Sequence, residues 1–435
     1  MLFINLLKHI VRPKRLTILM FLVFKQINVN KRNRMRTAFV SYSIIALFCL
    51  TGCLSDKSVQ DTLAFDIKKT YAEKEILLTD IADVTYVHLS TDNDDYLYSG
   101  RNFRITKNTV VVGDNNTGNI LFFTKEGNPK SHFNHKGQGP EEYINIHQLM
   151  YDEILDEVYV SYHDVVQVYS STGIYKRKIS MPQGMVISDI IDFDDQSFFF
   201  FDGFSYVMTH FKHAGVDNYT EVDYVYPFYR VSKTTGEVLD YIEFPGTDLR
   251  LGYFFDRQWS NANPRIVLQK CVEGAWLCNI ETDTIYLYRV DQPLTPVIYQ
   301  TPSVRSLNPM EYISRIVDKC QYQYLQVTVL SDGGFGFFQN KYYLRNKITG
   351  ETVHPKFLLS DYTGKEFIMN PQRPNDNGRV AMDGFVYDDG YCFELGLYEL
   401  KQAYQENRLS GKLKELVSTL NEDEDNNVFM FVNFK

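Results

Sequence analysis

Residues 136–179 carry the strongest structural signal in the sequence and read KGQGPEEYINIHQLMYDEILDEVYVSYHDVVQVYSSTGIYKRKI. Two runs, 158–162 and 165–169, place β-branched and aromatic side chains at every second position, which puts them on one face of a strand. Polar residues separate the runs where the chain must reverse. Gly173 can take the positive φ of a tight turn. The stretch therefore predicts two paired strands, a turn and an outgoing strand.

The same stretch begins with a corner that contains Gly137, Gly139 and Pro140. We expect both glycines to take positive φ, as at Gly173. Pro140 fixes its own φ and has no backbone donor, so it does not suit the middle of a sheet. We predict that these three residues form a rigid structural turn.

The pattern of strands followed by a turn recurs along the chain. Turn glycines stand at positions 127, 173, 236 and 350, and the last interval is about twice as long as each of the others. That interval contains a strand-like run, 284–289, followed by Asp291-Gln292-Pro293 in place of a glycine turn. A weaker sixth unit lies at 385–393. Six units of roughly 45–60 residues are typical of a β-propeller with four-stranded blades.

Two isolated strands, 84–89 and 428–434, stand at the ends of this repeat region. A ring of blades can close when one end of the chain completes a blade that the other end began, and no open edge then remains. Helical insertions are expected at 307–319, where Asn308, Pro309 and Glu311 suit a helix start, and at 412–420. We predict an all-β, six-bladed propeller over residues 62–435.

The N-terminal region has the features of a targeting segment. Residues 35–52 combine a short basic start with an apolar core that ends in Leu50-Thr51-Gly52-Cys53, and this resembles the lipobox of bacterial lipoproteins. The resemblance implies that Cys53 is lipidated and that 53–61 form a tether. Residues 1–34 are expected to reflect a start codon assigned too early, with a longer basic region as the alternative.

Charge limits the choice of partner. Residues 1–52 hold nine Lys and Arg and no acidic residue, so their removal leaves 36 basic and 54 acidic side chains. Such an acidic chain argues against nucleic acid or an anionic membrane surface as a partner. Membrane attachment is expected through acyl chains.

Four cysteines remain after the signal region: Cys271, Cys278, Cys320 and Cys392. Export makes disulfides possible, and four cysteines allow three pairings. Cys271 and Cys278 could pair across a hairpin, while small buried apolar side chains are the alternative interpretation. The spacing fits no zinc pattern.

Residues 136–179 resemble an NHL-type repeat. Residues 60–435 resemble the six-bladed β-propeller lipoproteins of Bacteroides-like bacteria, and 425–435 resemble the ending of that family except that Asn427 replaces a proline. The resemblance implies the fold and export. It implies little about chemistry, because fold does not determine function.

Candidate sites are few. The histidines at 132, 135, 147 and 163 lie close in sequence, but His132 and His135 would face opposite sides of a strand, so scattered histidines are expected and no metal site. Asp92-Asn93-Asp94-Asp95 lacks the glycine and distant glutamate of a calcium loop. Some propeller lactonases hold a calcium ion in the central channel with Asn, Asp and Glu side chains from different blades. Calcium is therefore kept as a candidate cofactor. Aromatic and polar side chains that suit sugar rings occur together at Tyr253, Phe255, Arg257 and Trp259, although packing between blades is the alternative.

These observations favour an exported, lipid-anchored protein that binds or scaffolds a glycan, a peptide or another protein without catalysis. The alternative is a calcium-dependent hydrolase or lyase acting on a lactone or a glycan. We expect a monomer on the outer membrane that faces the periplasm, with the cell surface as the alternative.

Overall fold

The computed structural model describes residues 62–91, 94–99, 102–162, 164–182, 185, 187, 189–202, 228–242, 267–278, 283–309, 311–330, 338–367, 385–387 and 390–435. The chain divides into two compact units, Met1–Asp61 and Thr62–Lys435. All described residues belong to the second unit.

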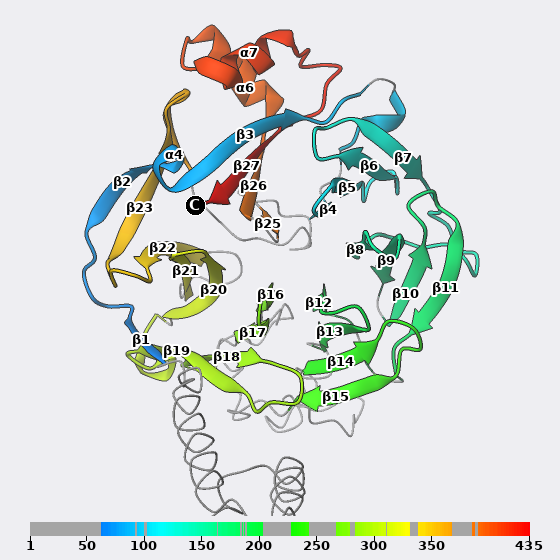
Figure 1. The fold of residues 1–435 in the computed structure, drawn as a ribbon, viewed down its shortest axis with the longest axis horizontal. Helices are drawn as coiled ribbons and strands as arrows, with labels where there is room; N and C mark the ends of the chain where they lie inside the picture. The colour runs from blue at the N-terminus through cyan, green and yellow to red at the C-terminus, as the bar shows by residue number, and fades with distance from the viewer. Residues whose placement is uncertain are drawn as a thin grey trace, which may run out of the picture. The chain divides into compact units, whose positions relative to one another are not determined.

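Six sheets form the second unit, and each contains four antiparallel strands that follow one another from the centre outward, named here blades 1–6 (Figure 1). The first three blades contain only such strands. Blade 1 comprises β4 (Asn102–Ile105), β5 (Thr109–Gly113), β6 (Ile120–Thr124) and β7 (Pro129–Phe133). Blade 2 comprises β8 (Gln148–Asp152), β9 (Glu157–Tyr162), β10 (Val165–Tyr169) and β11 (Tyr175–Ser180). Blade 3 comprises β12 (Asp189–Asp192), β13 (Ser197–Phe201), β14 (Phe228–Ser232) and β15 (Val238–Ile242).

Each of the last three blades also pairs with a strand from the N-terminal part of the described chain. Blade 4 comprises β16 (Val267–Cys271), β17 (Gly274–Cys278), β18 (Thr284–Tyr288) and β19 (Thr295–Thr301). Blade 5 comprises β20 (Glu311–Lys319), β21 (Tyr322–Leu330), β22 (Phe338–Asn346) and β23 (Thr352–Leu359), with β24 (Tyr362–Phe367) beyond it. Blade 6 comprises β25 (Phe385–Tyr387), β26 (Gly390–Leu395), β27 (Val428–Phe434) and β3 (Ala82–His88).

Blade 6 closes the ring as the sequence predicts. Strand β3, from the N-terminal part, pairs antiparallel with β27 at the C-terminus, from Ala82 opposite Phe434 to His88 opposite Val428. The prediction of an all-β, six-bladed propeller closed by strands from both ends is confirmed.

The segment before β3 forms a strap that the sequence did not predict. Strand β1 (Leu63–Asp66) pairs parallel with β19, and β2 (Glu73–Leu77) pairs parallel with β23. The one-turn helix α4 (Leu78–Ile81) then leads into β3. The strap therefore adds an outer strand to blades 4 and 5, so the four predicted strands are the core of those blades and not their full extent.

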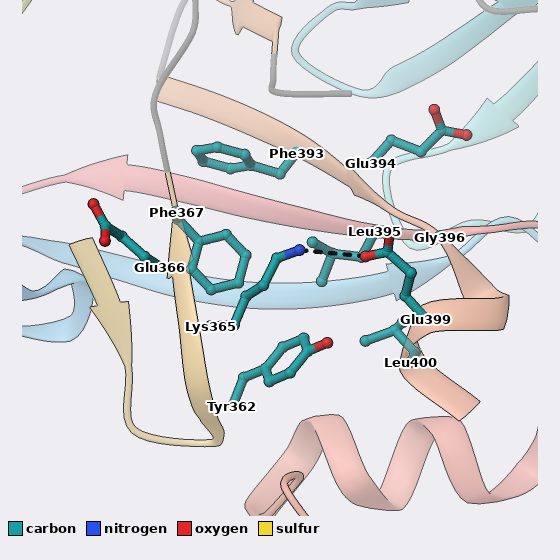
Figure 2. Close-up of a pocket in the computed structure, with 10 residues that line it drawn as sticks. All are labelled: Tyr362, Lys365, Glu366, Phe367, Phe393, Glu394, Leu395, Gly396, Glu399 and Leu400. Carbon is teal, nitrogen blue, oxygen red and sulfur yellow. Dashed lines mark hydrogen bonds and ion pairs between the residues drawn. The ribbon is translucent and has the colours of Figure 1, made fainter. Parts of the chain in front are cut away.

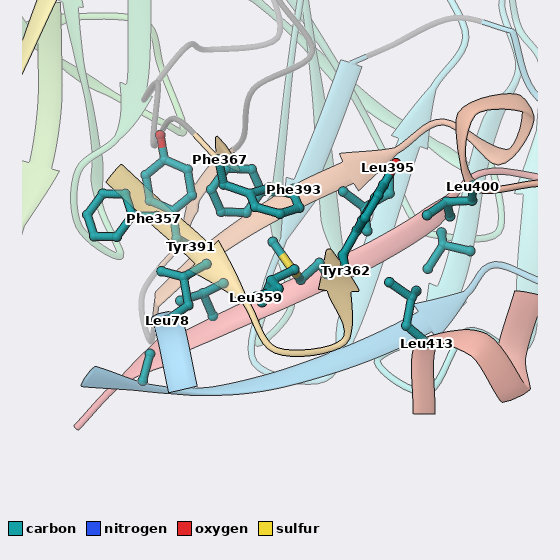
Figure 3. Packing of buried hydrophobic residues seen from close by; sticks show 14 of the residues in the cluster. Leu78, Phe357, Leu359, Tyr362, Phe367, Tyr391, Phe393, Leu395, Leu400 and Leu413 are labelled. Carbon is teal, nitrogen blue, oxygen red and sulfur yellow. The ribbon is translucent and has the colours of Figure 1, made fainter. Parts of the chain in front are cut away.

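The apolar core is divided among the interfaces between neighbouring blades. One cluster joins blades 1 and 2 and includes Val111, Phe122 and Leu149. Equivalent clusters join each following pair, and one that contains Phe103 and Phe429 joins blade 6 back to blade 1. The cluster between blades 5 and 6 includes helix residues as well as strand residues (Figure 3). Period-two alternation explains this arrangement, because each blade buries both of its faces.

The turn glycines behave as predicted. Gly127, Gly173, Gly236 and Gly350 each join the third and fourth strands of a blade, with φ between +73° and +93°. In blade 4 Asp291 takes the equivalent place with φ 56°. Aspartate tolerates this region better than most residues, which explains why it can replace glycine.

The corner at 136–143 needs its glycines for a different reason from the one predicted. Neither Gly137 nor Gly139 is among the residues with positive φ, so that part of the prediction is wrong. A Cβ on Gly137 would lie 1.9 Å from Oε2 of Glu142, and the same oxygen accepts a hydrogen bond of 2.8 Å from the Gly139 amide. The glycines leave space for this carboxylate, and the segment that includes Pro140 is a turn as expected.

The helix expected at 307–319 is wrong. Residues 311–319 form β20, whose residues pair with β21 from Glu311 opposite Val329 to Lys319 opposite Tyr322. Ile313, Ile316 and Val317 are β-branched and suit a strand, and this outweighed the apparent helix start. The expected helix at 412–420 is confirmed as α7 (Gly411–Thr419), and α6 (Leu397–Gln405) precedes it. No helix among the described residues combines the length and hydropathy needed to cross a membrane.

Candidate functional site

A pocket of about 380 Å³ lies where an outer strand of blade 5 meets blade 6 (Figure 2). Strand β24 contributes one wall, the end of β26 contributes the second, and the first turn of α6 contributes the third. Ten residues line it: Tyr362, Lys365, Glu366, Phe367, Phe393, Glu394, Leu395, Gly396, Glu399 and Leu400.

The local sequence explains how the pocket forms. Leu397, Leu400 and Ala403 lie three residues apart on one face of α6 and are buried, which holds the helix against the sheet. A Cβ on Gly396 would meet nothing within 4 Å, so the start of the helix borders open space. The pocket is therefore the space left between a helix docked on blade 6 and the extra strand β24.

Aromatic side chains form the floor of the pocket. Tyr362, Phe367 and Phe393 are almost fully buried, and Phe367 contacts Phe393 edge to face at 5.9 Å between ring centroids. They belong to the same apolar cluster as Leu400 (Figure 3). Because the rings are held by packing on several sides, the floor is preorganised and offers apolar contact without a further loss of side-chain freedom.

Charged side chains stand at the rim of the pocket. Lys365 Nζ lies 3.3 Å from Glu399 Oε2, and both side chains are about half exposed. Glu366 also lines the pocket from β24, but in Figure 2 it extends to the other side of Phe367 from this pair. Glu394 points away from the space in Figure 2, and its Oε1 accepts a hydrogen bond of 2.8 Å from Asn427. The rim therefore presents the paired Lys365 ammonium and Glu399 carboxylate on one side of Phe367 and the Glu366 carboxylate on the other.

A second polar cluster lies at the start of the inner strand of blade 5. Glu311 is buried, and its two oxygens accept hydrogen bonds from Lys68 at 2.5 Å and Lys341 at 2.9 Å. Burial acts to raise the pKa of Glu311, but the hydrogen bonds and charges of the two lysines outweigh it, and the pKa is lowered. Each oxygen of this carboxylate is paired with a lysine, and because Lys68 belongs to the strap, Glu311 fastens the strap to blade 5.

Most site residues proposed from the sequence lie outside the described residues. These are Cys53, Tyr253, Phe255, Arg257, Trp259 and His163. Among the described histidines, His132 packs edge to face on Tyr96, whereas His135 stacks on Tyr169. The two rings thus contact different elements, although His135 lies just beyond β7 and the prediction had placed both residues on one strand. Within the described part of the chain no group of three or more His, Cys, Asp or Glu side chains could hold a metal ion.

The suggested bridge between Cys271 and Cys278 does not fit the hairpin. Cys271 pairs with Gly274 at the turn, whereas Cys278 pairs with Val267 at the other end of the same two strands. Four residues of strand span about 13 Å, well beyond the reach of a disulfide. Cys271, Cys320 and Cys392 are free cysteines, and burial raises the pKa of the Cys271 thiol.

The pocket itself was missed from the sequence. Its walls come from segments about 30 residues apart, and their apolar residues resemble ordinary strand positions. The one available signal was the aromatic content of 362–367 and 391–393 next to an amphipathic helix.

Comparisons with known proteins agree with this architecture. Residues 56–241 match the DUF5128 family model, described as a 6-bladed beta-propeller. The chain is a six-bladed β-propeller. A crystal structure of a Bacteroides fragilis protein, described as exported, superposes with a TM-score of 0.57 over 86% of this chain and 99% of that one, at 16% identity. A DUF4221 family member from Bacteroides vulgatus gives a TM-score of 0.42 at 12% identity, over 82% of this propeller and 97% of its own chain. A comparison with curated protein sequences found no match.

Proposed function

We propose that this propeller is an exported, lipid-anchored binding protein whose ligand occupies the pocket between β24, β26 and α6. The observation that carries the proposal is the combination of a packed aromatic floor with a charged rim in one pocket of about 380 Å³. Sites for small ligands usually combine apolar walls with a few placed polar groups. The likeness to an exported Bacteroides protein and the basic–apolar start of the sequence support an envelope location, with Cys53 as the anchor.

The rim favours a ligand that carries hydroxyl or amino groups. Glu366 and Glu399 can accept hydrogen bonds from either, and Lys365 can donate to a hydroxyl or a carbonyl oxygen. An oligosaccharide or a peptide with a basic side chain meets both requirements. A glycan or peptide ligand of a monomeric protein therefore fits this site best.

Thermal unfolding of the mature protein tests the proposal. A ligand that binds the folded state raises Tm, so a panel of oligosaccharides and basic peptides is added in turn. We expect at least one member to raise Tm in the parent protein. The double variant Glu366→Lys, Glu399→Lys should lose that shift, because it replaces both rim carboxylates with ammonium groups.

Glu415→Lys provides the matched control, since Glu415 is an exposed helix residue outside the pocket lining. It should keep the ligand shift. A shift that the rim variant retains would place the ligand elsewhere, and Trp259→Ala would then be tested. A rise in Tm with calcium that EDTA reverses would instead favour the hydrolase or lyase alternative.

A further inference from the structure

The four most exposed aliphatic side chains among the described residues all lie on turns. Val272 is fully exposed, and Ile154, Ile348 and Ile174 are 91%, 76% and 68% exposed. Turns are ordinarily occupied by Gly, Pro, Asn, Asp and Ser, each for a conformational reason. β-Branched apolar residues have no such reason to stand at a turn in water.

These turns belong to a single face of the ring. In blade 5 the amide of Lys347, between the third and fourth strands, donates to Gln321 O, between the first and second strands, at 2.7 Å. In blade 2 the Ser171 amide donates to Asp156 Oδ1 at 3.1 Å in the same way. The turn between the first and second strands and the turn between the third and fourth strands therefore lie at the same end of each blade. We call the surface that they form together the turn face.

Contacts between blades show that the turn face is continuous across blades 1, 2 and 3. Glu153, in the first turn of blade 2, accepts hydrogen bonds from the amide of Asn108 at 3.2 Å and from Thr109 Oγ1 at 2.6 Å, both at the first turn of blade 1. Lys233, after the third strand of blade 3, reaches Asp152 in blade 2 at 3.4 Å. The turns of blades 1, 2 and 3 thus adjoin one another, and the aliphatic tips of blades 2, 4 and 5 belong to turns at this same end of their blades.

The described chain enters the propeller at this face. Thr62 Oγ1 donates to Pro296 O at 3.2 Å, next to the turn that begins β19. Strand β1 then runs parallel to β19, away from the turn face. Cys53 precedes Thr62 by nine residues, and a fully extended chain of that length reaches about 30 Å.

Charged groups beside the aliphatic tips are already paired within the protein. Glu273, next to Val272, forms an ion pair with Arg289, and Lys347, next to Ile348, forms one with Asp318. A paired charge costs less to bring to a lipid surface than an isolated one. The corresponding turns of blades 1 and 3 carry the charged residues Lys107 and Asp195. Because these charges would have to stay in water, the turn face can make only shallow contact with lipid.

We propose that the turn face rests on the lipid bilayer that holds the acyl chains of Cys53, with Ile154, Val272 and Ile348 inserted at the boundary between headgroups and acyl chains. The proposal depends on the lipid anchor of the proposed function. Tips on three separated blades suit a flat surface, and apolar side chains bind there without needing anionic lipid. Because the protein is acidic, contact with zwitterionic lipid is favoured.

This orientation directs the pocket away from the membrane. Strand β26 begins at Gly390, beside the turn face, and ends at Leu395, which lines the pocket. The turn face and the pocket therefore lie at opposite ends of blade 6. A ligand in the aqueous phase could enter the pocket while the turn face contacts lipid.

Tryptophan quenching in vesicles tests the orientation. The full-length lipidated protein is reconstituted in phosphatidylcholine–phosphatidylethanolamine vesicles with or without brominated phosphatidylcholine, which quenches tryptophan inside the bilayer. Ile154→Trp and Ile348→Trp should each lose fluorescence in the brominated vesicles relative to the parent protein. Ile144→Trp is the control, because Ile144 is 52% exposed but precedes β8, at the other end of blade 2 from its turns. It should show no loss.

Flotation of the vesicles separates the two ways in which the experiment can fail. Protein that does not float overturns the lipid anchor, and with it the orientation. Protein that floats without quenching at either tip, or with equal quenching at the control, overturns the orientation alone and assigns the aliphatic tips to a protein partner. Loss of tip quenching in high salt would also contradict the proposal, because apolar insertion is not screened.

Discussion

Gly127 and Gly350 occupy equivalent turns of blades 1 and 5, and their surroundings differ. Their φ angles are +93° and +73°, a region where an L side chain costs about 1–2 kcal/mol. A Cβ on Gly127 would also lie 2.0 Å from the carbonyl oxygen of His88, whereas a Cβ on Gly350 would meet nothing within 4 Å. Substitution at the two sites therefore separates the cost of the backbone conformation from the cost of a steric clash.

We expect Gly350→Ala to lower the free energy of unfolding by about 1–2 kcal/mol and Gly127→Ala by roughly 2–5 kcal/mol, since the second change adds a steric clash to the same backbone cost. Urea unfolding of both variants provides the measurement. Equal losses of unfolding free energy would show that blade 1 shifts to accommodate the added Cβ without losing stability. The close approach of Gly127 to His88 would then not be stabilising.

Glu157 provides a prediction about acid stability. Arg177 donates hydrogen bonds of 2.6 and 2.7 Å to its two oxygens, and these lower the pKa of Glu157 to about 2 from an ordinary value of 4.5. A lowered pKa means that the stabilisation is complete above about pH 4.5 and is lost as the pH falls through about 2. Glu157→Gln should therefore lower the unfolding free energy at pH 7 by about 2–3 kcal/mol, and this deficit should shrink towards pH 2.

Urea unfolding between pH 7 and pH 2 measures the deficit. Glu351→Gln is a suitable control, because the Glu351–Lys74 pair is about half exposed and such pairs contribute little. A deficit that stays constant with pH would mean that the Glu157→Gln variant is destabilised by packing and not by loss of the charge.

At the level of elements, the sequence was informative wherever one strand pairs with its neighbour in the chain. The predicted run 284–289 matches β18 to within one residue at its end, because alternation and a following turn are both local signals. The strap was not predicted, since β1 and β19 are more than 200 residues apart and parallel pairing leaves no turn between them. The pocket was missed for the same reason, because it depends on how β24 meets α6.

The strap provides a prediction at this scale. Phe65 of β1 is buried and lies against Tyr343 of blade 5, with 5.2 Å between ring centroids. Phe65→Ala should cost about 3–5 kcal/mol locally and release β1 from blade 4. We expect trypsin to cut after Lys68 and Lys69 much faster than in the parent protein, while blades 1–6 stay folded.

Leu77→Ala is the matched control for the strap, because Leu77 ends β2 and is 39% exposed. It should leave the rate of cleavage unchanged. If Phe65→Ala instead unfolded the whole propeller, the strap would be part of the cooperative core and not an outer addition to blades 4 and 5.

For the whole molecule, the position of the core at the blade interfaces determines how stability is shared. Each blade contributes apolar residues to the clusters on both sides of it, and blade 6 joins the two ends of the ring through clusters that contain Val428, Phe429 and Met430. Strand β27 is central to blade 6, since it pairs with β26 on one side and β3 on the other. A ring differs here from a linear array of repeats, in which each unit depends only on its immediate neighbours.

Removal of residues 426–435 should therefore affect the complete propeller and not blade 6 alone. Without β27, strand β3 has no partner in its blade, and the apolar faces of blades 1 and 5 lose part of their covering. We expect the shortened chain to show no cooperative thermal transition by near-UV circular dichroism. Removal of only Phe434 and Lys435, which are less buried, should keep a single transition at a lower Tm. A cooperative transition in the longer deletion would show that blades 1–5 fold as an open array, because closure by the two ends of the chain would then not be required for stability.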